Sequence, residues 1–305
     1  MKKIPVWKNV ILLVSLLVVI IIATFAWFYD RPWTSVEDII VPVGKASYVQ
    51  ISGDQGNSWS DEVDIELGVN KNFKEISGNG SMFFAPVYDT VQNSDDSFST
   101  QILSFYQVGK GVRYYEETFE FRSDVSQDIY LSPESYVTAV DQSGNSYIDG
   151  AVRVAFFEVD ADGKETLKLI WAPNSTVQYS AATNSFTRTG SVEPYYYYQK
   201  STVIVDPATL TPGVYNDHVA MISTAGTDQN GCGYNAAHRF MWTNGENMPS
   251  NAPSILKLDV AGEDNLYYKK MKVKVWIEGH DRECVSLLSG QRFAMKLHFD
   301  AQKGE

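Results

Sequence analysis

The chain has 305 residues, of which 44% are hydrophobic and 20% are charged, a composition typical of a globular protein and not of a disordered one. Its net charge is −12, and removing the three lysines of residues 1–28 leaves 22 basic and 37 acidic residues, a balance of −15 for the remainder. An acidic surface disfavours nucleic acid, whose phosphates need Lys and Arg, and also disfavours peripheral docking on anionic lipid.

The chain begins with a segment that predicts delivery to a membrane. Lys2, Lys3 and Lys8 precede a run without charged residues, Val10–Phe28. At about 1.5 Å per residue its 19 residues reach about 28 Å, close to the ~30 Å hydrocarbon core of a bilayer. The lysines should stay in the cytoplasm, so we expect Asp30 onward to lie outside.

The fate of this segment has two interpretations. A cleaved signal peptide would place Thr24 and Ala26 at positions −3 and −1 of a cut after Ala26. A retained transmembrane anchor is equally compatible, because the run is long for a signal peptide. The sequence thus predicts a signal or anchor at 1–28 and an extracytoplasmic domain at 29–305. The domain lies on the cell membrane with its C-terminal part extracellular, or is secreted to the cell surface if the signal is cut.

The segment Trp33–Val43 is extended and carries the apolar residues Ile39, Ile40, Val41 and Val43. Such a segment forms a first strand of its own sheet, or it adds to the sheet of a neighbouring molecule by β-augmentation. Both interpretations stay open at this point, and the second makes self-association a predicted partnership.

Alternation of period two marks the later part of the chain as β-rich. It is clearest in Glu117–Arg122, Lys272–Ile277 and Arg292–Phe299, where Phe293, Met295, Leu297 and Phe299 should face a core. Further strands are expected at Tyr48–Ser52, Val63–Val69, Ala151–Val159, Thr166–Trp171, Tyr195–Gln199, Thr202–Val205, Val219–Ser223 and Ile255–Val260.

No convincing amphipathic helix follows residue 30, so the pattern predicts an all-β fold, an antiparallel β-sandwich of roughly ten to fourteen strands. Asp160–Gly163 should form a hairpin turn between two strands. The polar stretch 224–253 should be a long loop or a small subdomain, because structureless loops of that length are uncommon.

Candidate chemical groups are few. Cys232 and Cys284 form a disulfide, which export permits, or remain separate thiols. The charged cluster Glu278–Cys284 is expected to be the last hairpin loop; together with His218 or His238 it could instead bind a metal. Neither H-E-x-x-H nor G-x-S-x-G occurs, so we predict no catalytic residue, no metal site and no cofactor.

Both ends of the chain resemble a known family. Ala23–Asp30, followed by the extended run Val43–Ser52, is similar to the start of TasA/camelysin-like surface proteins of Gram-positive bacteria, and Arg292–Asp300 resembles their last strand. Trp276–Cys284 is similar to the C-terminal hairpin of a set of Firmicutes exported proteins.

The resemblance implies a jelly-roll-like sandwich and subunits that assemble into extracellular fibres, an N-terminal segment of one adding a strand to the next. Some camelysin-like members have been called metalloproteases, but the zinc-protease motif is absent from this sequence.

We therefore expect a non-enzymatic cell-surface or extracellular (biofilm) matrix protein, either a fibre-forming subunit or a membrane-anchored domain. One alternative is an outer-face carbohydrate-binding module or glycan-active protein, which would need an exposed row of Trp and Tyr. Another is a metal-dependent hydrolase built around His280.

Overall fold

The computed structural model describes residues 35–42, 49–65, 73–78, 80–95, 97–132, 134–140, 146–171, 173, 177–180, 182–188, 195–197, 239–241, 254–279, 284, 288 and 290–303. These residues form strands and one short 3₁₀ helix, η1 (Ile148–Gly150), so the predicted all-β fold is confirmed. None of the helices in this part of the chain is long and apolar enough to span a bilayer. The predicted segment 1–28 lies outside the described residues.

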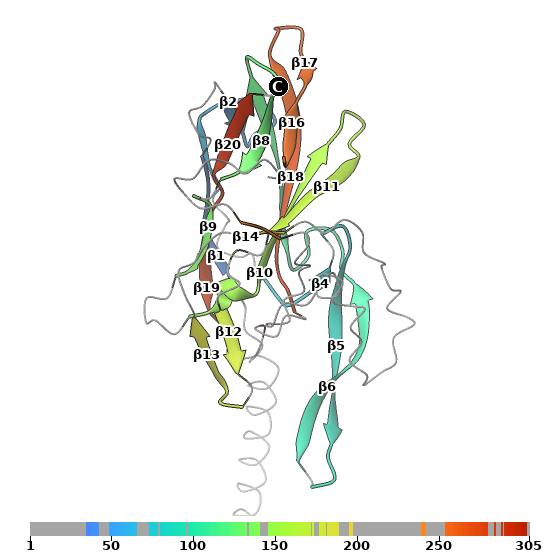
Figure 1. Ribbon diagram of the computed structural model, residues 1–305. Coiled ribbons are helices and arrows are strands. Elements are labelled where there is room, and N and C mark those ends of the chain that lie inside the picture. The colour runs from blue at the N-terminus through green and yellow to red at the C-terminus, as the bar shows by residue number, and fades with distance from the viewer. Residues whose placement is uncertain are drawn as a thin grey trace, which may run out of the picture.

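A six-stranded antiparallel sheet forms the centre of the molecule (Figure 1). In spatial order its strands are β11 (Glu165–Trp171), β10 (Val152–Val159), β18 (Tyr267–Ile277), β7 (Tyr115–Ser123) and β2 (Val49–Ser52), and the short β17 (Val260–Ala261) pairs with β18.

The longest central strand, β18, shows why this sheet forms. Alternate residues Met271, Val273 and Val275 are fully buried on one face, whereas Lys270 and Lys272 lie on the other. A strand with period two places one set of side chains in a core and the other toward solvent. The Lys272–Ile277 strand predicted from the sequence is therefore confirmed, and it begins five residues earlier than expected.

Smaller sheets surround the central one. A four-stranded sheet has the order β3 (Glu62–Ile65), β1 (Ser35–Pro42), β19 (Arg292–Lys296) and β9 (Tyr136–Ala139). One three-stranded sheet has the order β16 (Leu256–Leu258), β8 (Gln127–Leu131) and β20 (Phe299–Lys303). A second three-stranded sheet has the order β4 (Ser77–Gly78), β5 (Phe83–Gln92) and β6 (Phe98–Gln107). Two pairs complete the set: β12 (Val177–Ser180) with β13 (Ser185–Arg188), and β14 (Tyr195–Tyr197) with β15 (Arg239–Met241).

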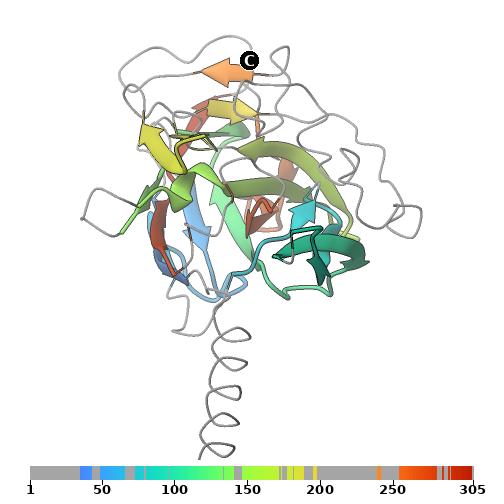
Figure 2. The same cartoon turned by 90° about the horizontal axis from the view of Figure 1, so that it is seen from below.

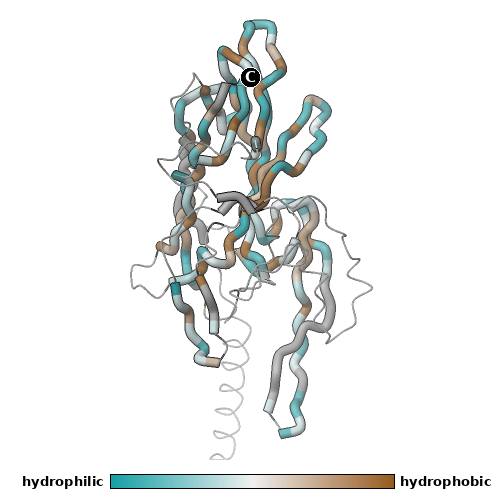
Figure 3. The backbone as a smooth tube through the Cα atoms, in the orientation of Figure 1, coloured by the Kyte–Doolittle hydropathy of each residue, from teal (hydrophilic) through white to brown (hydrophobic). Residues whose placement is uncertain are grey.

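The main core lies between one face of the central sheet and the strands β8, β16, β19 and β20. Phe299 of β20 contacts Phe121 of β7 edge-to-face, with ring centroids 5.4 Å apart, and lies 6.1 Å from Phe156 of β10. Apolar faces of separate sheets thus meet in one cluster, which burial of apolar area stabilises. Apolar residues appear in brown where the strands converge (Figure 3).

A second, smaller core covers the opposite face of the central sheet. There Phe157 and Trp276 of the sheet pack in one cluster with Phe83 and Ala85 of β5. The rings of Phe83 and Trp276 lie 5.1 Å apart. This cluster fixes the base of the β5–β6 hairpin on the sheet, and the rest of the hairpin extends away from it (Figure 1). Seen from below, the hairpin lies to one side of the central sheet (Figure 2).

Two expectations for the C-terminal part are wrong. Arg292–Phe299 is not one strand: β19 ends at Lys296 and β20 begins at Phe299, in different sheets. At the change of sheet, the backbone N–H of His298 donates to Ser135 Oγ, 2.8 Å away. The four residues predicted to face a core, Phe293, Met295, Leu297 and Phe299, are nevertheless all buried.

The second error concerns the segment that begins at Glu278. Because β18 and β19 belong to different sheets, the chain between them cannot be a hairpin loop. The side chain of Glu278 is buried, and its carboxylate accepts a hydrogen bond of 3.0 Å from Trp276 Nε1. Residues 280–283 lie outside the described residues.

Candidate functional site: the sheet around β1

The predicted strand-donor segment lies inside a sheet of its own chain. Ile39, Ile40 and Val41 belong to β1, which pairs antiparallel with β3 through Ile39–Ile65, Ile40–Asp64 and Val41–Val63. Val43, the fourth residue named for this role, lies outside the described residues. In this structure β1 therefore has strand partners on both of its edges.

The other partner of β1 is the penultimate strand of the chain. β1 runs parallel to β19, with Ile39 opposite Met295 and Ile40 opposite Lys296, and the register shifts between Val36 and Ile39. A parallel pair is slightly less stable per residue than an antiparallel one, and the shift interrupts it further. The pairing of β1 with β19 is thus the less regular of the two pairings that hold β1 in its sheet.

The strand that receives β1 is firmly anchored. Phe293 and Met295 of β19 are buried in the main core, and the ring of Phe293 contacts Phe73 at 5.7 Å. On its far edge β19 pairs with β9. β19 would therefore keep its place, with one edge open, if β1 were withdrawn.

β3 is in a different position. β3 is a four-residue strand at the edge of this sheet, and among the described strands its only ladder partner is β1. Removing β1 would leave a slot between β3 and β19 whose two walls offer unpaired backbone groups. An extended segment of the same sequence would satisfy those groups with the same register.

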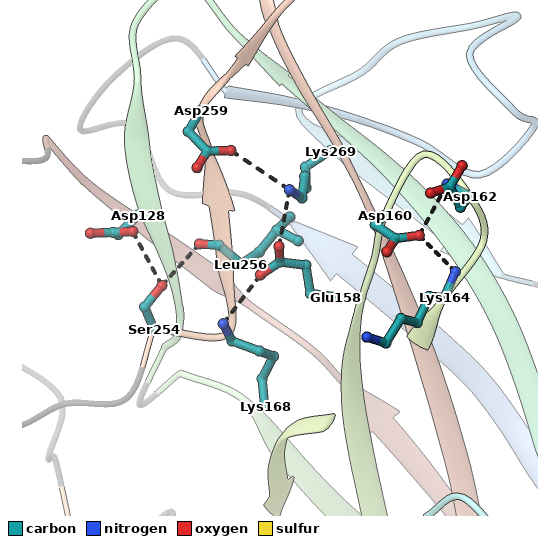
Figure 4. Close-up of polar contacts among 10 residues, drawn as sticks. All are labelled: Asp128, Glu158, Asp160, Asp162, Lys164, Lys168, Ser254, Leu256, Asp259 and Lys269. Carbon is teal, nitrogen blue, oxygen red and sulfur yellow. Dashed lines mark hydrogen bonds and ion pairs between the residues drawn. The ribbon is translucent and has the colours of Figure 1, made fainter. Parts of the chain in front are cut away.

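A separate polar cluster joins charged side chains of β10, β11 and β18 (Figure 4). The Glu158 carboxylate of β10 lies 3.0 Å from Lys269 Nζ of β18 and 3.2 Å from Lys168 Nζ of β11. Lys269 Nζ is also 3.6 Å from the Asp259 carboxylate, which lies between β16 and β17. The cluster ties three strands of the central sheet to the β16 segment.

The electrostatics of this cluster favour fixed charges. Burial opposes ionisation of Glu158, but hydrogen bonds from Lys269 and Lys168 outweigh it and lower the pKa of Glu158. Burial likewise opposes the charge of Lys269, and the hydrogen bond to Glu158 outweighs it, so the pKa of Lys269 is raised. A general acid or base works best with a pKa near the operating pH, and both shifts lead away from neutrality. The arrangement suits a structural ion-pair network.

A second carboxylate on the opposite face follows the same pattern. Glu165 binds the ammonium groups of both Lys272 and Lys274, the latter at 2.8 Å. Burial opposes its ionisation, but these hydrogen bonds outweigh it and lower the pKa of Glu165. Neither network is evident from the sequence, because the members of each are far apart in the chain and meet only through the register of β10, β11 and β18.

The neighbouring polar contacts in Figure 4 shape the backbone. Ser254 Oγ donates to the main-chain oxygen of Leu256 at 3.0 Å and to Asp128 at 3.4 Å. The Asp160 carboxylate accepts the N–H groups of Asp162 and Lys164, at 3.0 and 2.7 Å. Asp160–Gly163 is thus the hairpin turn predicted between β10 and β11, and the Asp160 side chain closes that turn.

The remaining site predictions have mixed outcomes. Thr24, Ala26, Cys232 and the histidines His218, His238 and His280 lie outside the described residues, so the cleavage site and the disulfide stay predictions. Cys284 is half-buried and packs against the main core. In the described part of the chain no group of three or more His, Cys, Asp or Glu is arranged to hold a metal ion.

The described tryptophans give little support to a glycan-binding face. Trp171 and Trp276 are fully buried, and Trp59 is half-buried. The guanidinium of Arg122 lies 4.4 Å from the ring centroid of Trp59 and covers one of its faces. Sugar rings stack on open aromatic faces, and these three rings do not form an exposed row.

Comparison of the chain with protein-family models, with curated proteins and with solved structures found no match.

Proposed function

We propose that this chain is a non-enzymatic cell-surface or extracellular matrix protein, a jelly-roll-like β-sandwich delivered outside the cell by residues 1–28. Its subunits associate by strand exchange: β1 leaves its own sheet and fills the slot between β3 and β19 of the next molecule. The leading interpretation of the sequence, its export segment and its lack of catalytic motifs all support this proposal.

The observation that carries the proposal is the position of β1 in its sheet. It is the first described strand, it is held between β3 and β19, and it is followed after six residues by β2, which belongs to the central sheet. A strand near one end of a chain can move with little change to the remaining fold. The pKa values of Glu158 and Glu165, the carboxylates of the two ion-pair networks, are both lowered, in keeping with a structural role.

A reversible covalent lock tests this exchange. In residues 29–305, the pair Ile40→Cys and Asp64→Cys joins two directly paired residues of β1 and β3. A matched control, Gln178→Cys with Thr187→Cys, locks the β12–β13 hairpin instead. We expect the wild type and the control to form polymers on slow concentration. The oxidised β1 lock should stay monomeric and should polymerise after reduction.

Light scattering and electron microscopy report the polymers, and mass spectrometry of peptides identifies the disulfides formed. Polymerisation of the oxidised β1 lock at the wild-type rate would show that β1 does not exchange. A wild-type protein that stays monomeric at every concentration would remove the fibre-forming role altogether and would leave a membrane-anchored surface domain.

A further inference from the structure

The β5–β6 hairpin has an open edge along β6. β5 and β6 have ten residues each, and β4 pairs only with Phe83 and Phe84 at the base of β5. The order β4-β5-β6 leaves β6 at the edge of this sheet among the described strands. Figure 1 shows the hairpin extending away from the central sheet.

Backbone hydrogen bonds at the two ends of the hairpin, its tip and its base, determine which backbone groups face outward. At the tip, the Asn93 N–H donates to the Ser97 oxygen at 2.7 Å. Antiparallel pairs alternate between hydrogen-bonded and non-hydrogen-bonded, so the pair Thr90–Thr100, three steps further on, is non-hydrogen-bonded. The N–H and C=O of Thr100 therefore point out of the β6 edge, and those of Thr90 point out of the β5 edge.

The β5 edge carries features that oppose strand addition. At the base, the Val108 N–H donates to the Phe83 oxygen at 2.9 Å, and the same alternation places Pro86 with its nitrogen outward. Proline has no N–H to offer there, and β5 also contains the charged Asp89. Proline and charge are the usual means by which edge strands avoid pairing with another chain.

The β6 edge has neither of these features. β6 reads Phe-Ser-Thr-Gln-Ile-Leu-Ser-Phe-Tyr-Gln, and it is the only described strand of seven or more residues without a charged residue. A shift of register leaves Leu103 without an opposing residue, so the regular stretch is Phe98–Ile102, with Thr100 at its middle. Neutral segments of β-forming residues are the ones that pair with other chains.

We propose that Phe98–Ile102 pairs antiparallel with the same stretch of a second copy of this chain, across a two-fold axis at Thr100. Thr100 then lies opposite Thr100 of the second copy, and Phe98 lies opposite Ile102. In a two-fold contact the same surface of both subunits is used, and an antiparallel pair of identical strand edges has this symmetry. Because the stretch carries no charge, two chains of net charge −12 can meet there without like charges opposite each other. This contact is independent of β1 exchange, and it closes a dimer instead of extending a polymer.

The full chain in detergent micelles, studied by sedimentation velocity over a range of concentrations, provides the test. Thr100→Pro removes one outward N–H from the β6 edge, and Thr90→Pro removes the equivalent N–H from the β5 edge of the same residue pair. We expect the wild type and Thr90→Pro to shift from monomer to dimer as concentration rises. Thr100→Pro should lose this shift.

Charge variants keep the test informative if proline disturbs the hairpin. Thr100→Lys and Thr100→Glu should each be monomeric, since a like charge then lies opposite itself. An equimolar mixture of the two should recover the dimer, whereas Thr90→Lys should dimerise as the wild type does. Hydrogen exchange of peptides covering residues 98–107 should slow only in the samples that dimerise.

Three results would overturn the proposal: a wild type that is monomeric throughout, a Thr100→Pro variant that dimerises as the wild type does, or a charge mixture that stays monomeric. The β1 lock should not change the dimer. Failure of strand exchange and failure of the β6 contact are therefore separate results.

Discussion

The contact between Phe121 and Phe299 offers the sharpest measure of how the sheets are held together. Phe121 belongs to the central sheet and Phe299 to the sheet of β8, β16 and β20; both are fully buried, and their rings meet edge-to-face at 5.4 Å and 85°. Changing either residue to alanine removes a large buried side chain and leaves a cavity. We expect each single variant to lose about 3–5 kcal/mol of unfolding free energy.

The double variant isolates the contact between the two sheets. Aromatic pairs of this geometry contribute about 0.5–1.5 kcal/mol beyond buried area, so the double variant should lose less than the sum of the two single losses by about that amount. Denaturant titration of residues 29–305, monitored by Trp fluorescence and circular dichroism, gives the four free energies of the cycle. If a variant is too unstable, Phe→Leu at both positions provides a milder cycle.

A second cycle serves as the control. Phe83 lies in the second core on the opposite face of the central sheet, so Phe83→Ala and Phe299→Ala should be additive within about 0.5 kcal/mol. Strict additivity of the Phe121 and Phe299 losses would refute a stabilising contact between these two rings. Coupling of Phe83 with Phe299 as strong as that of Phe121 would show that the cycle does not report local contact.

Three further predictions concern charges and turns. Asp149 is 2% exposed and pairs with Arg188 at 2.8 Å, so Arg188→Ala should cost about 3–5 kcal/mol at pH 7 in thermal or urea unfolding, and Arg188→Lys less. Burial raises the pKa of Asp149. A carboxyl group with a raised pKa lowers the free energy of unfolding as pH rises through that pKa, because the buried group must then ionise. The destabilisation caused by Arg188→Ala should therefore be smaller in acid, where Asp149 is protonated. Glu158→Gln should cost about 1 kcal/mol at pH 7, and because the pKa of Glu158 is lowered, this difference should vanish as pH falls through that pKa. Gly80 and Gly163 both have φ near +80°, so Gly163→Ala should cost about 1–2 kcal/mol of unfolding free energy. Gly80→Ala should cost more, because only there would the new Cβ lie 3.1 Å from atoms of Ala155 and Phe157.

Local patterns in the sequence predicted the individual strands well where each strand has one face in a core. β7 follows the alternation expected for Glu117–Arg122, with Phe119 and Phe121 buried, and the hairpin turn at Asp160–Gly163 carries the usual Asp and Gly. The same rule could not reveal the break between β19 and β20. Both strands face the main core, so the alternation continues unchanged through a change of sheet.

The β5–β6 hairpin was not predicted, although it contains two of the longest strands. The segment between its strands, residues 93–97, consists of Asn, Ser and Asp, which favour a turn, but the strands themselves mix Ser, Thr and Gln with apolar residues, so no clear alternation marks them as strands. The parallel pairing of β1 with β19 also has no local signal. It joins residues more than 250 positions apart, and only the assembled core determines which strands become neighbours.

The two proposed contacts differ in whether the backbone hydrogen-bonding groups of the strand are already paired within its own chain. β1 could pair with another chain only by leaving a slot that already satisfies both of its edges, so exchange must cross a barrier and should be slow. The β6 edge needs no such release, and its association should be fast and reversible, but five residues make a small contact that should be weak in dilute solution. A slow, strong contact along a fibre and a fast, weak contact between fibres would favour long single filaments at low protein density and bundles at high density. The order in which filaments and bundles appear as concentration rises therefore tests both contacts in one experiment, and bundles that form before filaments would contradict this assignment of strong and weak contacts.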